Sequence, residues 1–374
     1  MRNWSAIAFN TAPDSENKIH GDELAKEYGF EGGLVPGVTI SAYLIHPVIE
    51  LWGEEWLEKG FANCRITSPL YDNENFEVIL VDNNSTDGSI EFVTQNYPQI
   101  IVIKLDSNKG FAEPNNIGAK IAKGEHLLFL NNDTVTTTNF ISEMVQVLQK
   151  DEQVAICQSL LLKPNGDVDS SGDFIDRMGI VYNSKKMTEQ IKEISSARGA
   201  SMMIRRKIFD KLGGFDEKFF FSFEDVDLGW RSWILGYKVV IVPNSIVYHS
   251  AGKTSSKLKS EAAFHGLKNQ LAMKITNFEP RFALRSLLLF FFVYGSREIK
   301  IWFDYKIKGS TTMTSTSYEN KIADNPSLKT VIKSIVWIFN NIGYLRSKHK
   351  HVNKNRILST TSLQKIRIIS NEKQ

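Results

Sequence analysis

The chain has 374 residues, which exceeds one ordinary domain and suits two domains, or one large domain with appendages. Hydrophobic residues make up 42% and charged residues 23%, which is a globular composition and excludes a mainly disordered chain. Two cysteines, Cys64 and Cys157, are too few for a disulfide framework or a cysteine-based zinc site, which favours a reducing compartment. We see no signal peptide and no apolar run near the roughly 18 residues of a membrane span, so we expect a cytosolic or membrane-surface protein.

The net charge of +3 conceals a strong asymmetry. From Arg281 to the end there are 17 Lys and Arg against 5 Asp and Glu, a charge of +12, whereas the rest of the chain carries −9. A basic tail on an acidic body indicates a polyanionic partner, either a membrane surface or a nucleic acid. No nucleic-acid recognition motif accompanies the charge, so we expect no nucleic-acid partner.

Three regions of the chain differ in composition and in hydrophobic pattern. Residues 1–74 are acidic and rich in Gly, Trp and Pro turns, with helical patterns near 21–28 and 39–57. Residues 75–280 alternate strand-like apolar runs with helical spacing, the strands at 76–81, 100–105 and 127–130 and the helices at 89–97 and 115–123. This alternation predicts an α/β fold with a largely parallel sheet. Residues 281–374 predict helices and basic linkers.

Two polar loops follow the first two expected strands. The first, Asp-Asn-Asn-Ser-Thr-Asp from Asp82 to Asp87, offers short side chains that suit a nucleotide base and ribose, but also cap a helix. The second contains Lys109 and Gly110, where a glycine lets the backbone approach a ligand and a lysine can meet a phosphate. Taken alone, each loop favours an ordinary turn before a helix.

A carboxylate follows the third strand. The strand ends in Asn131-Asn132-Asp133, and an Asp at this position can hold Mg²⁺ or Mn²⁺ against a diphosphate, because hard cations prefer oxygen ligands. A helix cap explains the same residue equally well. His249 also lies at an expected strand end, before a flexible loop, where a structural histidine is the commoner outcome.

Three carboxylates, Glu224, Asp225 and Asp227, lie beside the aromatic run 219–221. Aromatic walls lower the local dielectric and can raise the pKa of a carboxylate towards useful base strength. The alternative is a helix start with Ser222 as its N-cap, since acidic residues also favour helix N-termini.

The order of these motifs over residues 76–280 resembles the family 2 glycosyltransferases, specifically the bacterial rhamnosyltransferase-like branch. The run from Gly214 to Arg231, followed by Tyr248-His249, is the most specific part. The resemblance implies a GT-A fold, a nucleotide-sugar donor such as a dTDP- or UDP-sugar, and transfer that inverts the anomeric centre.

Carried over by position, the resemblance assigns roles to individual residues. Asp225 would be the general base, with Glu224 beside it. Asp133 would be the metal-binding Asp of an Asp-x-Asp-like motif that has Asn131 as its first residue, and His249 would complete the metal or diphosphate site. The expected nucleotide-binding residues are Asp82, Asn84, Asp87, Lys109, Gly110, Asn115 and Asn132.

The N-terminal region departs from that family, because the buried strand and helix expected before Val81 are missing. Residues 17–74 instead resemble part of a MaoC-like hot-dog hydratase, carried by Gly-Gly-Leu-Val-Pro-Gly at 32–37 and Ser-Pro-Leu-Tyr-Asp at 68–72. That family pairs an Asp with a His five residues later, whereas Ser15 stands five residues before His20. We therefore expect a partial hot-dog segment (1–74), a GT-A domain lacking its first β-α unit (75–280) and a helical basic region (281–374).

The apolar run 286–294 has cations on both sides and suits a helix that lies in a membrane interface, or one that packs on the catalytic domain. Residues 331–350 repeat this pattern. The expected function is transfer of a sugar to a surface-polysaccharide or lipid-linked acceptor at the inner face of the plasma membrane. The resemblance alone implies that the sugar is rhamnose from dTDP-rhamnose. The alternatives are a hot-dog acyl-thioester hydratase or binding module, or a fused chain without activity.

Overall fold

The structure is a computed structural model that describes residues 5–7, 75–77, 79–98, 101–176, 179–250, 259–292, 328–365 and 369–370. The hot-dog expectation, which rests on residues 17–74, lies outside these residues, as does Cys64. Cys157 is a buried free thiol. A short antiparallel pair, β1 (Ser5–Ile7) and β2 (Asn75–Glu77), precedes the main body.

A small parallel sheet comes next in the chain. Strand β3 (Ile79–Asp82) is buried along its length and pairs in parallel with β4 (Ile101–Lys104). The crossover between them is helix α3 (Ser89–Asn96), whose buried Ile90 and Val93 pack against Leu80. A helical crossover is the connection that a parallel pair requires. Helix α4 (Ala112–Ile121) follows β4 and contacts β3.

The main sheet is mixed. Its strand order is β11 (Lys192–Glu193), β13 (Lys238–His249), β7 (Val154–Leu162), β12 (Ser201–Arg205) and β5 (His126–Leu130), with β6 (Thr134–Thr136) on β13 and β8 (Val168–Ser170) on β7. Of its described pairs, β13–β7 alone is parallel. The expectation of a largely parallel sheet is wrong here. The chain reaches β12 through the short strands β8–β11 and not through a helical crossover, so β12 runs opposite to both neighbours.

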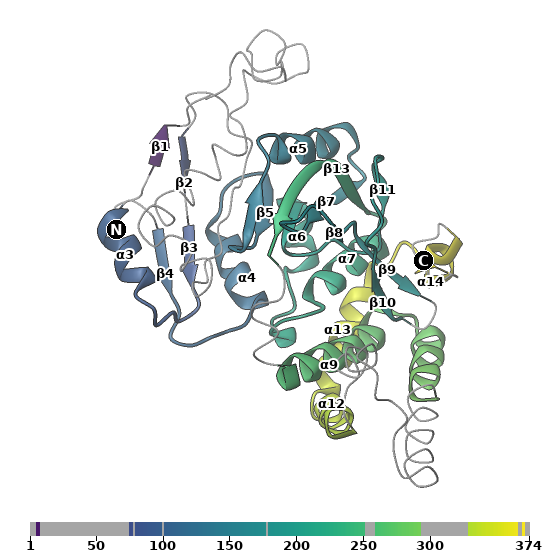
Figure 1. Cartoon of the computed structure of the whole chain (residues 1–374). Coiled ribbons are helices and arrows are strands. Elements are labelled where there is room, and N and C mark those ends of the chain that lie inside the picture. The colour runs from purple at the N-terminus through teal and green to yellow at the C-terminus, as the bar shows by residue number, and fades with distance from the viewer. Residues whose placement is uncertain are drawn as a thin grey trace, which may run out of the picture.

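Alternating side chains of this sheet enter two apolar cores. On one face Leu128, Cys157 and Val240 pack with α5 (Phe140–Lys150), and on the other Leu127, Ile156 and Ile241 pack with α6 (Arg206–Leu212) and α7 (Glu224–Ile234). This period-two alternation is what a strand with two covered faces produces. Figure 1 shows α5 at one side of the sheet and α6 and α7 at the other. The carboxyl end of β5 and the start of α7 are thereby fixed by buried packing.

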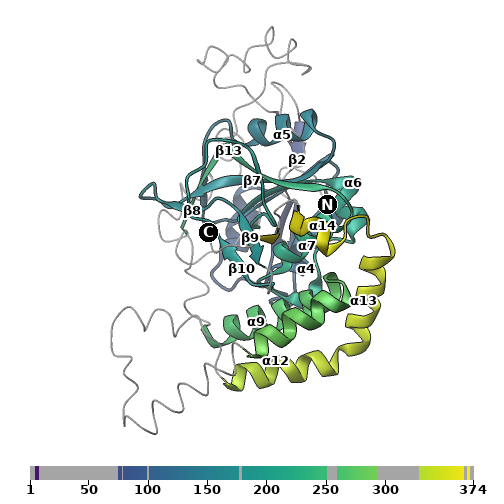
Figure 2. The same ribbon diagram turned by 90° about the vertical axis from the view of Figure 1, so that its right-hand side faces the viewer.

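Helices of the C-terminal region form an outer layer, as Figure 2 shows. Helices α12 (Leu328–Asn340) and α13 (Ile342–Lys354) both contact α9 (Lys259–Asn277), which in turn contacts α7. A further helix covers residues 280–292 and α14 (Thr360–Lys365) follows α13. A three-stranded sheet joins β9 (Asp173–Asp176) to β10 (Val181–Asn183) and β14 (Ile369–Ser370). Among the described helices, none is both long and apolar enough to cross a bilayer.

The described strands leave two sheet edges unpaired. Strand β3 bonds to β4 only and β5 bonds to β12 only within this part of the chain. Figure 1 shows β4, β3 and β5 in that order across the view, with α4 between β3 and β5. Helix α4 contacts β3, and its Ala112 and Ala119 share a core with Leu127 and Phe129 of β5. The two sheets are therefore connected through the helix and not through strand pairing.

Candidate active site

The loops after β3 and β4 are tied together by one asparagine. The Asn83 amide nitrogen donates to the Gly110 carbonyl at 2.8 Å, and its oxygen accepts the Lys109 N–H at 2.8 Å. Asp82 is 4% exposed, and its carboxylate accepts the Ser85 N–H at 3.1 Å. The structure thus joins the loop that begins after Asp82 to Lys109 and Gly110 through Asn83, and a role of this loop in nucleotide binding stays a prediction.

The other expected nucleotide residues divide between exposed and structural positions. Asn84 and Asp87 are exposed on the first loop, where Asn84 has a left-handed φ of 69° and Asp87 accepts the Ser89 N–H at 3.0 Å. Asn132 is half-buried beside Asp133. Asn115 is buried, and its amide donates to the Phe111 carbonyl within α4 at 2.7 Å. That contact gives Asn115 a local structural role.

Gly110 lies where the loop after β4 meets the segment before α7. It has φ +78°, and a Cβ there would lie 2.3 Å from the carbonyl oxygen of Phe220. The same oxygen accepts the backbone N–H of Phe111 at 2.6 Å and of Ala112 at 3.2 Å. Only glycine permits this close approach. The loop after β4 is therefore packed directly against the segment that leads into α7.

A line of three side chains lies beyond the end of β5. His249 ends β13, which pairs with β6 at Thr134 and so places the ring beside Asp133. Its Nε2 lies 3.4 Å from Asp133 Oδ1, and its Nδ1 lies 2.9 Å from Asp169 Oδ2. Burial opposes protonation of the ring, but the two carboxylates outweigh it and raise the pKa of His249 to about 9. The position therefore favours a positive charge, whether a proton or a metal ion.

These residues fit a divalent cation. Asp133 Oδ1 is buried, and its polar neighbour among the described residues is His249 Nε2 at 3.4 Å, too long for a good hydrogen bond. Two donor atoms 3.4 Å apart can both lie about 2.1 Å from one ion. Asp169 occupies the other ring nitrogen, which is the usual support of a metal-binding histidine. No group of three or more His, Cys, Asp or Glu side chains gathers as a metal site in the described part of the chain.

Asp225 lies on the first turn of α7 and is half-buried. Its Oδ2 accepts the Gly199 N–H at 3.1 Å and its Oδ1 accepts the Val226 N–H at 2.8 Å. Burial raises the pKa of Asp225, and the Gly199 N–H and the Arg198 guanidinium oppose that shift in part. A partly accessible carboxylate with a raised pKa suits a general base.

Glu224 differs from its neighbour. It is 6% exposed, and its Oε2 has no hydrogen-bond partner in the described part of the chain. Burial and the charge of Asp225 raise the pKa of Glu224 well above its usual value. The more accessible Asp225 is therefore the better candidate for proton transfer.

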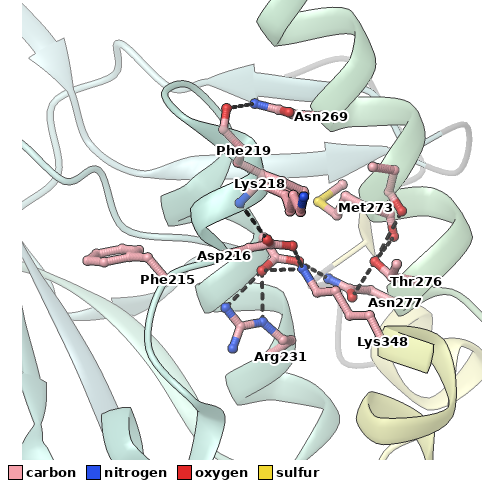
Figure 3. A network of polar contacts seen from close by, with 12 residues as sticks. Phe215, Asp216, Lys218, Phe219, Arg231, Asn269, Met273, Thr276, Asn277 and Lys348 are labelled. Atoms are coloured by element: carbon pink, nitrogen blue, oxygen red, sulfur yellow. Dashed lines mark hydrogen bonds and ion pairs between the residues drawn. The ribbon is translucent and has the colours of Figure 1, made fainter. Parts of the chain in front are cut away.

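Asp227 takes no part in the opening of the site. It is fully buried and accepts from Arg231 at 2.8 Å, from Asn277 at 2.8 Å and from Lys348 at 3.1 Å. Figure 3 shows this network, in which Lys348 of α13 also pairs with Asp216. The third carboxylate thus anchors α7 to the C-terminal helices.

Ser222 is not the N-cap of α7, contrary to the alternative interpretation. The cap is Phe223 in the left-handed region, without a side-chain cap hydrogen bond. The turn before α7 is instead held by residues distant in the chain, such as Phe111 and Asn269, and not by a local cap.

The structure adds site residues that the sequence patterns missed. Arg198 Nε lies 3.2 Å from Asp173, which is buried, and burial raises the pKa of Asp173 to about 6. Together with Asp169 they link the His249 side of the site to Asp225. Asp169 lies on β8, Asp173 on β9 and Arg198 in the segment before β12, and no short motif marks the two carboxylates.

Three comparisons bear on this geometry. Residues 53–213 match the model of glycosyl transferase family 2. The match begins upstream of the domain boundary expected at residue 75, which stays a prediction. The O-antigen biosynthesis protein RfbC of Myxococcus xanthus is 32% identical over 206 residues, 51% of this chain and 16% of the relative. The N-acetylglucosaminyl-diphospho-decaprenol L-rhamnosyltransferase of Mycobacterium tuberculosis is 25% identical over 218 residues, 50% of this chain and 71% of the relative.

Among solved structures, GalNAc-T7 with UDP, GalNAc and Mn²⁺ is similar with a TM-score of 0.43 and 16% identity, covering 70% of this chain and 51% of that one. The mannosyltransferase PcManGT of Pyrobaculum calidifontis with GDP-Man and Mn²⁺ is similar with a TM-score of 0.40 and 15% identity, covering 79% and 78%. The chain spans only a small part of the Myxococcus relative, and the residues that match the family model are fewer than half of this chain. A glycosyl transferase family 2 model thus matches residues 53–213 of this chain, and two relatives that share part of its sequence are named for O-antigen biosynthesis and L-rhamnosyl transfer.

Proposed function

We propose that this chain transfers a sugar from a nucleoside diphosphate to an acceptor hydroxyl with inversion at the anomeric carbon. The observation that carries the proposal is the pairing of two sites. Asp133 and His249 offer facing ligand atoms beyond β5, and Asp225 offers a half-buried carboxylate at the start of α7. Asp169, Asp173 and Arg198 lie between them. The family 2 domain supports the same reaction class.

The residues divide the reaction between them. Asp225 accepts the proton of the acceptor hydroxyl while the oxygen of that hydroxyl bonds to the anomeric carbon. The bond from the anomeric carbon to the diphosphate oxygen breaks at the same time. Proton transfer by a placed carboxylate is typically worth ~10²–10⁴-fold. The Gly199 N–H holds the carboxylate in one orientation. Attack from the face opposite to the leaving group gives the inverted product.

Asp133 and His249 would hold Mg²⁺ or Mn²⁺, which when bound neutralises charge on the leaving diphosphate. Asp169 keeps His249 Nε2 directed at Asp133 by bonding Nδ1 at 2.9 Å. Asp82, Asn84, Asp87, Lys109, Gly110 and Asn132 form the proposed nucleotide side.

The donor we propose is dTDP-rhamnose and the acceptor a surface saccharide or a lipid-linked saccharide. The L-rhamnosyltransferase and O-antigen names of two relatives support this choice. We also propose that the chain acts on the inner surface of the plasma membrane. Leu284, Leu288 and Phe292 are 60%, 61% and 73% exposed on helix 280–292, directly beside Arg281 and Arg285, which suits an anionic lipid surface.

We propose in addition that one strand position of the sheet lies between β3 and β5, and that the first strand expected before Val81 would occupy it. The unpaired edges of both strands in the described residues, and the contact of α4 with both, support this. Edges left open in that way would weaken nucleotide binding.

The experiment is an assay of nucleoside diphosphate release with a panel of dTDP-, UDP- and GDP-sugars and Mn²⁺, with a polyprenyl-diphosphate saccharide as acceptor. Acceptor-dependent release from dTDP-rhamnose supports the proposal in full. Acceptor-dependent release from another donor would support the proposed reaction but would replace dTDP-rhamnose as the proposed donor. No release from any donor by a folded chain contradicts the proposed function.

A further inference from the structure

The four residues before α7 have an unusual backbone. Phe220, Ser222 and Phe223 have φ of 64°, 71° and 71°, which places three side-chain-bearing residues in the left-handed region. Such residues are uncommon, and for bulky side chains this conformation is unfavourable. It persists where the surrounding structure determines it. Asp225 follows two residues later, so the direction of its carboxylate depends on this turn.

The side chain of Asn269, on α9, binds the backbone of this turn. Asn269 is fully buried, and its amide nitrogen lies 2.8 Å from the carbonyl oxygen of Phe219, 3.1 Å from that of Phe221 and 2.6 Å from that of Ser222. Figure 3 shows Asn269 reaching from α9 to Phe219. The chain after Phe219 is neither helix nor strand until α7 begins, so regular pairing does not supply donors for these three carbonyl groups. The Asn269 amide supplies one to all three.

The orientation of the Asn269 amide is itself fixed. Its Oδ1 accepts from Lys268 Nζ at 2.6 Å, and Lys268 also donates to the Lys218 carbonyl at 2.8 Å. Because a lysine can only donate, the amide oxygen must face it and the amide nitrogen must face the turn. On the other side of the turn, the Phe111 N–H binds the Phe220 carbonyl. The turn is therefore held between α4 and α9.

We propose that Asn269 is a positioning residue for Asp225. It acts through the backbone of the Phe219–Phe223 turn, which it keeps in the conformation that directs Asp225 to the Gly199 N–H and the acceptor side. The inference rests on the proposed transfer reaction. It assigns to a residue of α9, 44 positions from Asp225 in the chain and outside the matched residues 53–213, a part in catalysis.

The test compares Asn269→Ala with Asn277→Ala. Asn277 is a matched control, since it is a buried asparagine of the same helix whose amide donates to Asp227 and not to the turn. Two properties are measured for each full-length variant. The first is kcat together with the donor KM, and the second is hydrogen–deuterium exchange of the peptide that contains residues 219–225.

We expect Asn269→Ala to lower kcat by about 10²-fold, the size of effect that a displaced catalytic group produces, with the donor KM unchanged. Exchange in residues 219–225 should accelerate in this variant. Asn277→Ala should lower stability while it leaves that exchange and kcat near the wild-type values. Asn269→Ser, which keeps one donor, should show an intermediate loss of kcat and serves where the alanine variant does not fold.

An active wild type together with a fully active Asn269→Ala variant would overturn the inference alone. Equal losses of kcat in the Asn269 and Asn277 variants would also overturn it, because they would show a purely structural role. A folded wild type without any transfer would overturn the proposed function, and this inference with it.

Discussion

The two sides of the site are built in different ways. On the proposed nucleotide side, Asp82 and Asp87 accept hydrogen bonds within the loop after β3, Asn83 binds the loop after β4, and Asn84 and Asp87 are exposed. On the side of Asp225, α7 is joined through Asp227 by a buried ion pair to Lys348, which lies 121 positions further along the chain. The comparison indicates that residues of the proposed nucleotide side can be substituted at little cost in stability. The side that carries Asp225, the proposed general base, belongs to the buried core.

The largest effect should come from Asp225→Asn. The amide has the same shape but cannot accept the acceptor proton, so we expect kcat to fall by ~10²–10⁴-fold. Nucleotide binding should persist, because Asp225 lies on the other side of the site. Steady-state kinetics and a nucleotide thermal-shift titration measure the two properties. Wild-type turnover in this variant would remove the assignment.

The next effect concerns stability. Lys348→Met leaves the buried carboxylates of Asp216 and Asp227 without this cation, and breaking a buried pair typically costs ~3–5 kcal/mol. Urea denaturation measures it. The control is Lys104→Met, since Lys104 pairs with Glu91 at 3.5 Å on the nucleotide side with both side chains more than half exposed. A loss in the control as large as that in Lys348→Met would contradict the contrast between the two sides.

A smaller change is expected for Asp169→Asn. Asp169 supports His249 and does not face the proposed ion, and loss of such a partner typically lowers metal affinity 10–100-fold. Mn²⁺ binding followed by electron paramagnetic resonance measures this without any turnover. The matched control is Asp167→Asn, because Asp167 lies in the exposed turn beside the same strand. Unchanged Mn²⁺ affinity in Asp169→Asn would show that this carboxylate does not support the site.

A further effect is a pH dependence of stability near the turn. His265 stacks on Phe220 at 5.0 Å between ring centroids, and burial lowers the pKa of His265 to about 4. A base whose pKa is lower in the folded state contributes stability above its unfolded pKa of about 6.5, and loses that contribution as the pH falls towards 4. His265→Phe should flatten the stability profile between pH 6.5 and 4. An unchanged profile in this variant would assign the acid sensitivity to other groups.

Local patterns predict the elements that one segment determines. The strand 100–105 and the helix 89–97 agree with β4 and α3 to within one residue at each end, because an apolar run or an amphipathic spacing identifies each one. Strand direction in the main sheet was predicted wrongly, since it depends on how the chain returns between β7 and β12. That return consists of short strands without a strong period.

The same distinction applies to the site. Asp133, His249 and Asp225 stand in polar or aromatic motifs and could be named from the sequence. Asp169 could not, because it lies 80 positions from His249 and meets it through strand pairing. The basic C-terminal region predicted a polyanionic partner, yet Lys348 within it pairs with the buried carboxylates of Asp216 and Asp227. Charge counts alone do not separate these two roles.

The most direct test of the account is thermal stability in the presence of dTDP, UDP or GDP with Mn²⁺, for the wild type and for Asp133→Ala. A ligand at 100 times its Kd stabilises a fold by about 2.7 kcal/mol, which raises the Tm by several degrees. We predict such a shift with dTDP or UDP in the wild type and none in Asp133→Ala. The absence of a shift with every nucleotide in a folded wild-type chain, or an equal shift in both proteins, would contradict a metal-held nucleotide site at the end of β5.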